Sequence, residues 1–417
     1  MTSDADTLRA EIRARLPDPL PRRLGVAVSG GSDSTALMRL LADIAQREQI
    51  ALFAATVDHG LRADAASEAA TVANLAHNWG IPHETLKWRG WDGTGNLQDH
   101  ARRARYRLLT GWAQANGLGA IALGHTADDQ AETLLMRLAR AAGVSGLSAM
   151  AGMRREGETL LLRPMLAVTR ARLRDYLTAQ GIAWIDDPSN QDLRFDRIKT
   201  RQALSGLTQI GITAESLSRV AENLAQAREA LAQYAQESAA GVMRVMDGDL
   251  CVDPEGFAAL PEEIRRRLVV AAILWVAGGA YPPRHGAVDQ ALNALSAGQR
   301  MTVGGCILSF RGKKTWISRE LNAVSHKTAN PGEPWDGRWI VTGPTGPDAE
   351  IRALGDAGIL QLEDWRSVAK PRTALLSTPA VWAGDTLLAA PLAGFAQGWR
   401  AEMVSERSDF LAAILSH

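Results

Sequence analysis

Short apolar runs alternate with longer amphipathic segments along the first 190 residues of the chain. This alternation is typical of an α/β domain, in which helices connect the strands of a parallel sheet and cover both of its faces. The predicted strands are residues 24–28, 51–57, 83–88, 119–124 and 159–162, and the predicted helices are residues 35–46, 64–79, 97–116, 127–141 and 170–180. Ligands bind beyond the carboxyl ends of the strands in such a sheet, so the residues that follow the strands are candidates for a site.

The pattern changes twice further along the chain. Apolar residues recur with a helical period from about residue 215 to residue 240, and a second helical segment at 262–276 follows Pro261. Beyond about residue 327, prolines and glycines separate short apolar runs. We therefore predict three domains, which are an α/β domain at 1–205, a helical domain at 206–326 and a small β-containing domain at 327–417.

The composition is that of an ordinary folded protein. The chain has 417 residues, 46% hydrophobic and 22% charged, and is too long for one compact core. Residues 1–15 carry scattered charges, and no later stretch stays apolar for the roughly 20 residues of a membrane helix. We therefore expect a cytoplasmic protein that does not enter a membrane. The net charge of zero gives no indication of nucleic-acid binding.

A loop rich in glycine and serine follows the first predicted strand and leads into a helix. It consists of Ser29, Gly30, Gly31, Ser32, Asp33 and Ser34. The glycines allow close approach of the backbone, and the amides at the start of the helix suit a pyrophosphate. Asp33 would be repelled by a polyphosphate unless Mg²⁺ lay between them. The loop lacks the Gly-Lys-Ser/Thr ending of phosphate-transferring NTPases. A purely structural turn is the alternative interpretation.

A group of carboxylates follows the fourth predicted strand, in the sequence Gly-His-Thr-Ala-Asp-Asp-Gln-Ala-Glu-Thr at 124–133. Thr126 and Asp129 have the spacing of a capping box, so a helix is predicted to begin here. Asp128 and Asp129 lie four and three residues before Glu132, so the three carboxylates can share one face of that helix. Such a group can hold Mg²⁺ against phosphates or bind an ammonium ion. Helix capping is the alternative role for Asp128.

The two segments together resemble the PP-loop family of ATP pyrophosphatases, whose loop has the pattern Ser-Gly-Gly-x-Asp-Ser. The string at 125–133 is similar to the motif of one branch, the tRNA(Ile)-lysidine synthetases. Further matches follow in the expected order, at 57–62, 101–106, 146–147, 163–164, 187–190 and 195–197. The resemblance covers about residues 20–205 and implies the fold of the adenine nucleotide α-hydrolases. The chain departs from the family pattern at Gln98, at 140–143, at Met165 and at Ile198.

The resemblance implies a reaction. Enzymes of the PP-loop family split ATP between its α and β phosphates and activate an acceptor oxygen as an adenylate. In the branch resembled here, the acceptor is the wobble cytidine of the isoleucine tRNA with a CAU anticodon. Free L-lysine then displaces AMP at C2 of that cytidine. The resemblance therefore implies a ligase that uses ATP and Mg²⁺ and forms lysidine through an adenylated tRNA.

The resemblance also implies roles for single residues. The loop at 29–34 would bind ATP, with Asp58 near the ribose or the adenine, while Asp33 and Asp128 would hold Mg²⁺. The other catalytic candidates are Asp129 and Glu132 for the charged groups of lysine, Arg105 for a phosphate or the lysine carboxylate, and His125 as a proton acceptor. The candidates for tRNA phosphates are Arg194, Arg197, Lys199 and Arg201 in the first domain, and Arg265, Arg266 and Arg267 in the second. Either basic cluster could instead be a solvated helix face.

Three alternative functions stay open at this point. A tRNA 2-thiocytidine synthetase of the same family would need paired cysteines, but the only cysteines are Cys251 and Cys306. A synthetase for a small molecule would normally bring a glutaminase domain or an ammonia-handling partner. An RNA-binding protein with a relic nucleotide site would be free to lose the carboxylates that this chain carries. For the assembly we expect a monomer or a homodimer.

Overall fold

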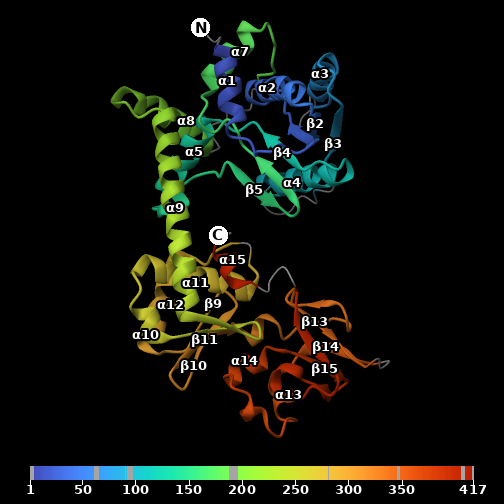
Figure 1. The fold of residues 1–417 in the computed structure, drawn as a ribbon, viewed down its shortest axis with the longest axis vertical. Coiled ribbons are helices and arrows are strands. Elements are labelled where there is room, and N and C mark those ends of the chain that lie inside the picture. The colour runs from blue at the N-terminus through green and yellow to red at the C-terminus, as the bar shows by residue number, and fades with distance from the viewer. Residues whose placement is uncertain are drawn as a thin grey trace. The chain divides into compact units, whose positions relative to one another are not determined.

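The computed structural model describes residues 4–60, 65–89, 91, 97–186, 196–279, 281–344, 348–404 and 409–415. The chain groups into two compact units, Met1–Arg228 and Glu229–His417, and helix α9 (Ala214–Val242) contains the division between them (Figure 1). The first unit includes the predicted 1–205 domain, the second includes the predicted 327–417 domain, and the predicted 206–326 domain is shared between them. In the described part of the chain, no helix is long and apolar enough to cross a membrane.

The first unit is built on one six-stranded sheet with the order β3-β2-β1-β4-β6-β5. Its strands are β1 (Arg23–Ala27), β2 (Ala51–Asp58), β3 (His83–Lys87), β4 (Ala120–Leu123), β5 (Met153–Glu156) and β6 (Thr159–Leu162). All except β5 are parallel, and they form where the sequence predicts strands. β5 pairs antiparallel with β6 at the sheet edge. The sequence did not predict β5, because its residues Met-Arg-Arg-Glu are mostly exposed and form no apolar run.

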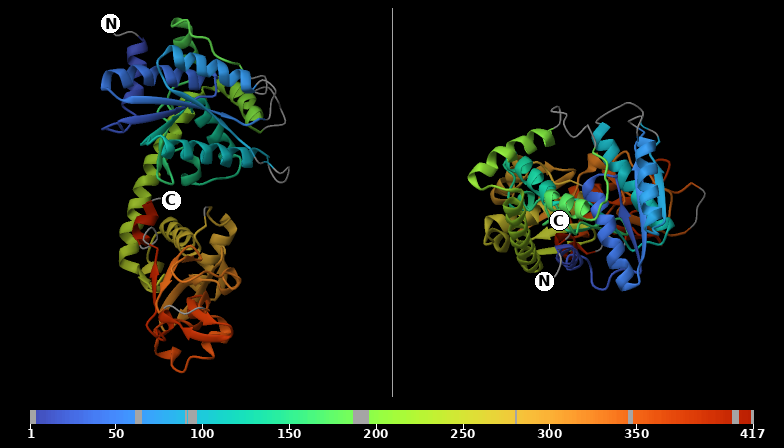
Figure 2. Two further views of the ribbon diagram at one scale, coloured as in Figure 1. Left: turned by 90° about the vertical axis from the view of Figure 1, so that its right-hand side faces the viewer. Right: turned by 90° about the horizontal axis from the view of Figure 1, so that it is seen from above.

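Helices cover both faces of this sheet, as predicted (Figures 1 and 2). The helices of this unit are α1 (Asp4–Arg13), α2 (Ser32–Glu48), α3 (Ala65–Asn78), α4 (Leu97–Ala115), α5 (Ala127–Leu138), α6 (Val144–Leu147), α7 (Arg170–Ala179) and α8 (Asp196–Leu207). Successive residues of a strand point to opposite faces of a sheet. Leu24 and Val26 of β1 accordingly pack in one core with α1, α2, α3 and α7, whereas Ala27 packs in a second core with α4.

The second unit combines a five-stranded antiparallel sheet with two three-stranded sheets. The larger sheet, in the order β7-β8-β11-β10-β9, consists of β7 (Met243–Met246), β8 (Asp249–Val252), β9 (Met301–Val303), β10 (Cys306–Arg311) and β11 (Lys314–Arg319). The smaller sheets consist of β12 (Pro334–Trp335), β13 (Trp339–Thr342) and β17 (Arg400–Met403), and of β14 (Glu350–Ala353), β15 (Pro379–Ala383) and β16 (Thr386–Ala389). The helices are α10 (Pro254–Ala258), α11 (Glu262–Ala277), α12 (His285–Ala297), α13 (Gly355–Ile359), α14 (Arg372–Leu376) and α15 (Phe410–Leu415).

The five-stranded sheet is the main feature of the fold that the sequence did not predict. Helices α9, α11 and α12 confirm the helical character predicted for 206–326, but the same segment also contains this sheet. The strands are three to six residues long, too short for an alternating pattern to stand out. Two tight turns give a clearer signal: Asp247-Gly248 has φ values of 44° and 75°, and Gly304-Gly305 has 57° and 75°. Consecutive positive φ values favour a two-residue hairpin turn.

Buried charges surround the turn between β7 and β8. The Lys370 ammonium group is 2% exposed and donates to the Asp247 carbonyl oxygen at 2.9 Å and to Asp249 Oδ2 at 3.0 Å. Arg338, also 2% exposed, donates to the carbonyl oxygen of Gly248. Burial raises the pKa of Asp249, and the charge of Lys370 offsets only part of that effect. We call Asp249, Arg338 and Lys370 the core cluster, since it ties a hairpin turn to two distant segments of one unit.

Candidate functional site

The loop at 29–34 has the geometry of an anion-binding turn. Gly31 is the N-cap of α2, which begins at Ser32, so backbone amides at the helix start point beyond the sheet edge. The Ser34 hydroxyl closes the loop: it accepts from the Ser29 N–H at 3.1 Å and donates to the Gly31 carbonyl oxygen at 3.1 Å. Gly30 has a φ of 88°, and a Cβ atom there would lie 2.7 Å from Ile185 Cδ1. The conformation of the loop is therefore fixed by its own hydroxyl groups and by glycine.

Gly124 brings the carboxylate helix against this loop. It follows β4, the strand next to β1 in the sheet. A Cβ atom at Gly124 would lie 2.9 Å from Ser34 Cα and 3.0 Å from Ser34 N. The approach of backbone to backbone therefore requires glycine. The sequence analysis did not assign Gly124 a role, although a glycine between a buried strand and a polar motif is the signal that would have indicated one.

Asp33, Asp128 and Asp129 converge on Arg170, the first residue of α7. Arg170 Nε donates to Asp33 Oδ2 at 2.9 Å, and the Arg170 backbone N–H donates to Asp128 Oδ2 at 2.7 Å. Arg170 Nη2 lies 3.8 Å from Asp129 Oδ1. The predicted helix start is confirmed, since Asp129 Oδ2 accepts from the Thr126 N–H at 2.9 Å. We call Asp33, Asp128, Asp129 and Arg170 the edge cluster.

The edge cluster holds more negative than positive charge. Burial raises the pKa of Asp33, and the attraction of Arg170 offsets only part of that rise. Burial works against the charge of Arg170, yet the carboxylates of Asp33 and Asp129 outweigh it and raise the pKa of the guanidinium. The two raised pKa values are consistent with each other, because Arg170 faces several carboxylates, whereas Asp33 faces only one arginine. A second cation would therefore be stabilised in the cluster.

Glu132 contacts a different arginine. Its side chain is fully buried, and Oε1 accepts a hydrogen bond from Nε of Arg201 on α8. Sequence analysis placed Glu132 with the aspartates and Arg201 among the candidates for tRNA phosphates, and it did not predict this ion pair. Of the remaining candidates in that group, Lys199 is exposed on α8 and Arg197 belongs to the same helix. Arg194 lies outside the described residues.

Asp58, Arg105 and His125 lie around the same edge of the sheet. Asp58 ends β2, and its Oδ1 accepts the Gly60 N–H at 2.8 Å, which is a turn-forming contact. Burial lowers the pKa of His59, and the positive charge of Arg105 lowers it further, so Arg105 lies near the end of β2. His125 follows β4, and β4 and β2 both pair with β1. All three side chains are half-buried.

The basic triplet in the second unit does not form one surface. Arg266 Nη2 pairs with Asp289 Oδ1 at 2.5 Å, and Arg267 Nη2 pairs with Glu263 Oε1 at 2.9 Å. Arg265, Arg266 and Arg267 are consecutive in α11, and successive helical residues point about 100° apart because a turn holds 3.6 residues. Two of the three charges are thus paired within the unit, and the role of these residues toward tRNA phosphates stays a prediction.

The loop between α6 and β5 is fastened by side chains that sequence analysis left without a role. Gln130, within the carboxylate motif, donates to the Met150 carbonyl oxygen at 3.0 Å and accepts the Met150 N–H at 2.8 Å. Arg137 Nη1 donates to the Ala149 carbonyl oxygen at 2.8 Å, and Arg163 Nη1 donates to that of Ala151 at 2.8 Å. These residues position the chain around the site and do not face a ligand through these bonds.

The chain is similar in sequence to one known family and to named relatives. The family described as PP-loop domain matches residues 5–207. A tRNA(Ile)-lysidine synthase of Ruegeria pomeroyi is 53% identical over 417 residues, which are 100% of both chains. A tRNA(Ile)-lysidine synthase of Methylobacterium sp. is 40% identical over 327 residues, covering 73% of this chain and 94% of the relative. A solved structure of the U34-tRNA thiolase NcsA from Methanococcus maripaludis matches 52% of this chain and 78% of its own, at 16% identity and a TM-score of 0.46.

Proposed function

The chain belongs to the tRNA(Ile)-lysidine synthase family, and on that premise we propose that it joins free L-lysine to C2 of the wobble cytidine in the CAU anticodon of an isoleucine tRNA. ATP is the co-substrate, and AMP and pyrophosphate are released. The observation that carries the proposal is the convergence of the loop at 29–34 and the carboxylate helix α5 on Arg170. One sheet edge thus offers donors for phosphates beside carboxylates for cations. A tRNA substrate also places the reaction in the cytoplasm.

The first half of the proposed reaction belongs to the loop. The C2 carbonyl oxygen of the cytidine attacks the α-phosphorus of ATP, and pyrophosphate leaves. The amides at the start of α2 and the Ser29 hydroxyl stabilise the negative charge that develops on the leaving group. Asp58 at the end of β2 and His125 after β4 lie on either side of β1 and flank the nucleotide.

Mg²⁺ fits this site as a companion of ATP. It usually binds proteins through one or two carboxylates together with substrate phosphates and water. Asp33 and Asp128 supply two such carboxylates next to the loop, and the excess of negative charge in the edge cluster favours a further cation. A bound Mg²⁺ would neutralise phosphate charge. No group of three His, Cys, Asp or Glu side chains that could hold a metal ion occurs among the residues that the structure describes.

The second half of the proposed reaction belongs to the carboxylate helix. Asp129 and Glu132 bind the charged groups of lysine, and Arg105 binds its carboxylate or a phosphate. Glu132 is buried and bonded to Arg201, so Arg201 must share that carboxylate with the incoming ammonium group or release it. The ε-amino group, with an ordinary pKa of about 10.4, loses a proton before it attacks C2 and displaces AMP. His125 is the proposed acceptor of that proton.

Contacts with the tRNA backbone are proposed for two groups of basic residues. In the first unit these are Arg194, Arg197, Lys199 and Arg201, and in the second unit Arg265, Arg266 and Arg267. Arg201 would act while bonded to Glu132, and Arg266 and Arg267 would act beside their carboxylate partners. Such contacts with phosphates provide affinity that falls with salt but do not read sequence.

Sulfur transfer to cytidine is disfavoured by the cysteines. Both belong to the second unit, Cys251 on β8 and Cys306 on β10. Burial raises the pKa of the Cys306 thiol to about 12, so that it stays protonated and unreactive at neutral pH. Burial also raises the pKa of Cys251. Neither thiol is activated for carrying sulfur, and the carboxylates that lysine transfer needs are all present.

Transfer of labelled lysine tests the proposed function. The full chain is incubated with ATP, Mg²⁺ and radiolabelled lysine, and with transcripts of one isoleucine tRNA that carry either a CAU or a UAU anticodon. We expect label only in the CAU transcript, with equal amounts of AMP and pyrophosphate released for each lysine incorporated. The UAU transcript is the matched control, because it replaces only the target base. Label in neither transcript contradicts lysine transfer, and label in both contradicts attachment at the wobble cytidine.

A further inference from the structure

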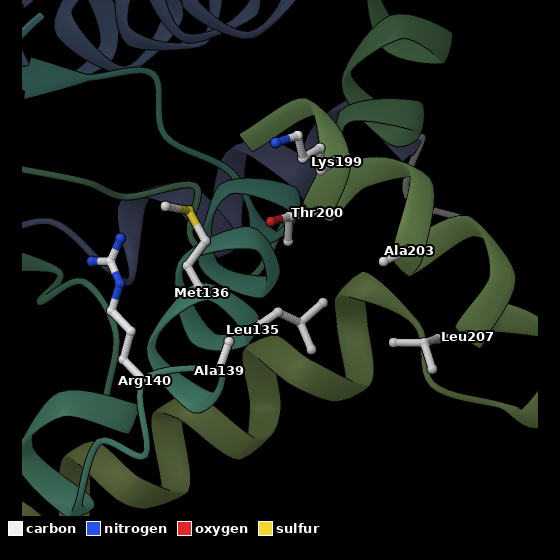
Figure 3. A pocket seen from close by; sticks show the side chains of 8 residues that line it. All are labelled: Leu135, Met136, Ala139, Arg140, Lys199, Thr200, Ala203 and Leu207. Carbon is white, nitrogen blue, oxygen red and sulfur yellow. The ribbon is translucent and has the colours of Figure 1, made fainter. Parts of the chain in front are cut away.

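A pocket of about 430 Å³ opens between α5 and α8 (Figure 3). Pockets that bind small ligands usually have volumes of about 300–1,000 Å³. The lining residues are Leu135, Met136, Ala139 and Arg140 of α5 with Lys199, Thr200, Ala203 and Leu207 of α8. None of these residues has a part in ATP binding or in lysine binding as proposed above, and the pocket therefore needs a separate explanation.

The pocket continues the face of α5 that carries Glu132. Residues three, four and seven positions apart lie on the same side of a helix, so Leu135, Met136 and Ala139 follow Glu132 along one face. On α8, the residue that bonds to Glu132 is Arg201, between the lining residues at 199–200 and 203. With a rise of 1.5 Å per residue, Met136 lies about 6 Å beyond Glu132 along the helix axis. The pocket thus begins beside the Glu132–Arg201 ion pair.

The lining has the chemistry of a nucleotide site. Its walls are mainly apolar, and its two charged residues, Arg140 and Lys199, are both cations. Figure 3 shows the apolar side chain of Met136 between Arg140 and Lys199, with Leu135 and Ala203 to its right. An apolar surface suits the face of a base, and cations at the rim suit the phosphates on either side of it. The absence of a carboxylate among the eight lining residues disfavours an amine or a metal ion.

We propose that this α5–α8 pocket receives the base of an anticodon-loop nucleotide next to the modified cytidine. The inference rests on the proposed function, because only an RNA substrate places a second base beside the one that reacts. Insertion of that base would fix the direction in which the anticodon crosses the site. The pocket would then hold the tRNA during both half-reactions without touching lysine or ATP.

Filling the pocket tests this inference. Ala203→Trp adds an aromatic side chain from an exposed position of α8 that lines the pocket, and Gln202→Trp adds the same side chain at an exposed neighbouring position that does not. We expect Ala203→Trp to raise the KM for tRNA on the order of tenfold, which corresponds to about 1.4 kcal/mol of lost binding free energy. The KM for lysine should stay unchanged, and Gln202→Trp should behave as the unaltered protein. An unchanged KM for tRNA, or equal effects of both variants, overturns the proposal.

An abasic tRNA provides a second arm of the test. The isoleucine tRNA with a CAU anticodon is prepared with a single base removed on either side of the cytidine, and its Kd for the unaltered full chain is measured by filter binding. One of the two abasic sites should weaken binding on the order of tenfold. The same abasic site should not weaken tRNA binding by Ala203→Trp any further, because the filled pocket no longer receives that base. Additive losses overturn the proposal, and so does binding indifferent to both abasic sites.

Free nucleotide is the other source of a base, and it gives a third arm. AMP added to the unaltered chain should not compete with tRNA for the pocket, and competition that Ala203→Trp abolishes overturns the assignment to the anticodon loop. Failure of lysine transfer with every tRNA would sink the proposed function. The binding measurements would still decide whether the pocket holds a base of RNA.

Discussion

The two units of the molecule bury charged side chains in different ways. In the core cluster of the second unit, the side chains of Lys370 and Asp249 are 2% and 6% exposed. In the edge cluster of the first unit, those of Arg170 and Asp33 are 22% and 16% exposed. Lys370 and Arg338 of the core cluster also donate to backbone carbonyl oxygens. In the edge cluster, Arg170 contacts three carboxylates instead. The core cluster is closed, and the edge cluster can still accept a cation.

This difference separates structural from functional burial of charge. A buried ion pair contributes little net stability, but the loss of one partner is costly because a charge is left without compensation. The core cluster therefore fixes the position of a hairpin turn. The edge cluster lies at helix N-termini, carries excess negative charge and keeps some contact with solvent, which are the properties of a site that exchanges partners.

The largest effect is expected from Asp33→Asn. The amide has the shape of the carboxylate but lacks the charge that binds Mg²⁺, so kcat/KM for ATP should fall on the order of 10²- to 10³-fold. The Kd for tRNA and the melting temperature should change little. Asp43→Asn is the matched control, since Asp43 lies on the same helix and pairs with Arg9 and Arg39. Near-normal activity of Asp33→Asn would show that Asp33 does not hold the metal.

The second effect concerns the core cluster. Lys370→Met leaves the Asp249 carboxylate buried without its ammonium partner and should lower the free energy of unfolding by about 3 kcal/mol. Burial already raises the pKa of Asp249, so the folded protein binds that proton more tightly than the unfolded chain. Stability should consequently fall as the pH rises, and more steeply in the variant. Denaturant unfolding at pH 5 and pH 8 measures both effects.

The control for this change is Lys314→Met. Lys314 and Asp253 form an ion pair in the same unit, with side chains 50% and 42% exposed. Solvent screens such a pair, so its loss should lower the free energy of unfolding far less than Lys370→Met does. Equal costs for Lys370→Met and Lys314→Met would show that the core cluster contributes no more than a surface pair, and the contrast between the two units would then fail.

A smaller effect on stability than that of Lys370→Met is expected from Arg170→Gln, the equivalent change in the edge cluster. Solvent reaches Asp33 and Arg170, so the free energy of unfolding should fall by only about 1 kcal/mol. The KM for ATP should change more than the melting temperature, because Asp33 and Asp128 lose the group that positions them. Arg170→Lys should restore stability but not the KM, since an ammonium group lacks the planar fork of arginine. A loss of stability as large as that of Lys370→Met would make the edge cluster structural.

Sequence patterns indicated the candidate site residues but not the side chains that contact them. The loop at 29–34 and the aspartates of α5 were found because each forms a contiguous motif at the end of a predicted strand. Arg170 could be predicted only as the start of a helix, because 137 residues separate it from Asp33 and the packing of α7 brings them together. Arg201 was assigned to RNA for the same reason, since no local pattern indicates that it reaches Glu132.

The predictability of the fold follows the apolar character of its strands as well as their length, since β4 and β6 have only four residues each but are apolar runs. The parallel strands of the first unit are buried apolar runs between amphipathic helices, and both patterns are visible in the sequence. In the second unit, β7 and β8 have four residues each and β9 has three. Runs so short carry little periodic signal, and their register depends on the Asp247-Gly248 and Gly304-Gly305 turns.

Gly124 has a consequence for how this site tolerates substitution. It supplies no charge and no donor to the proposed reaction, yet a methyl group there would press on the Ser34 Cα atom at 2.9 Å. That atom belongs to the backbone and cannot turn aside as a side chain would. In a saturation mutagenesis scan, position 124 should therefore be as intolerant as the carboxylates. The distance between the loop and the carboxylate helix thus depends on a residue that takes no part in the chemistry.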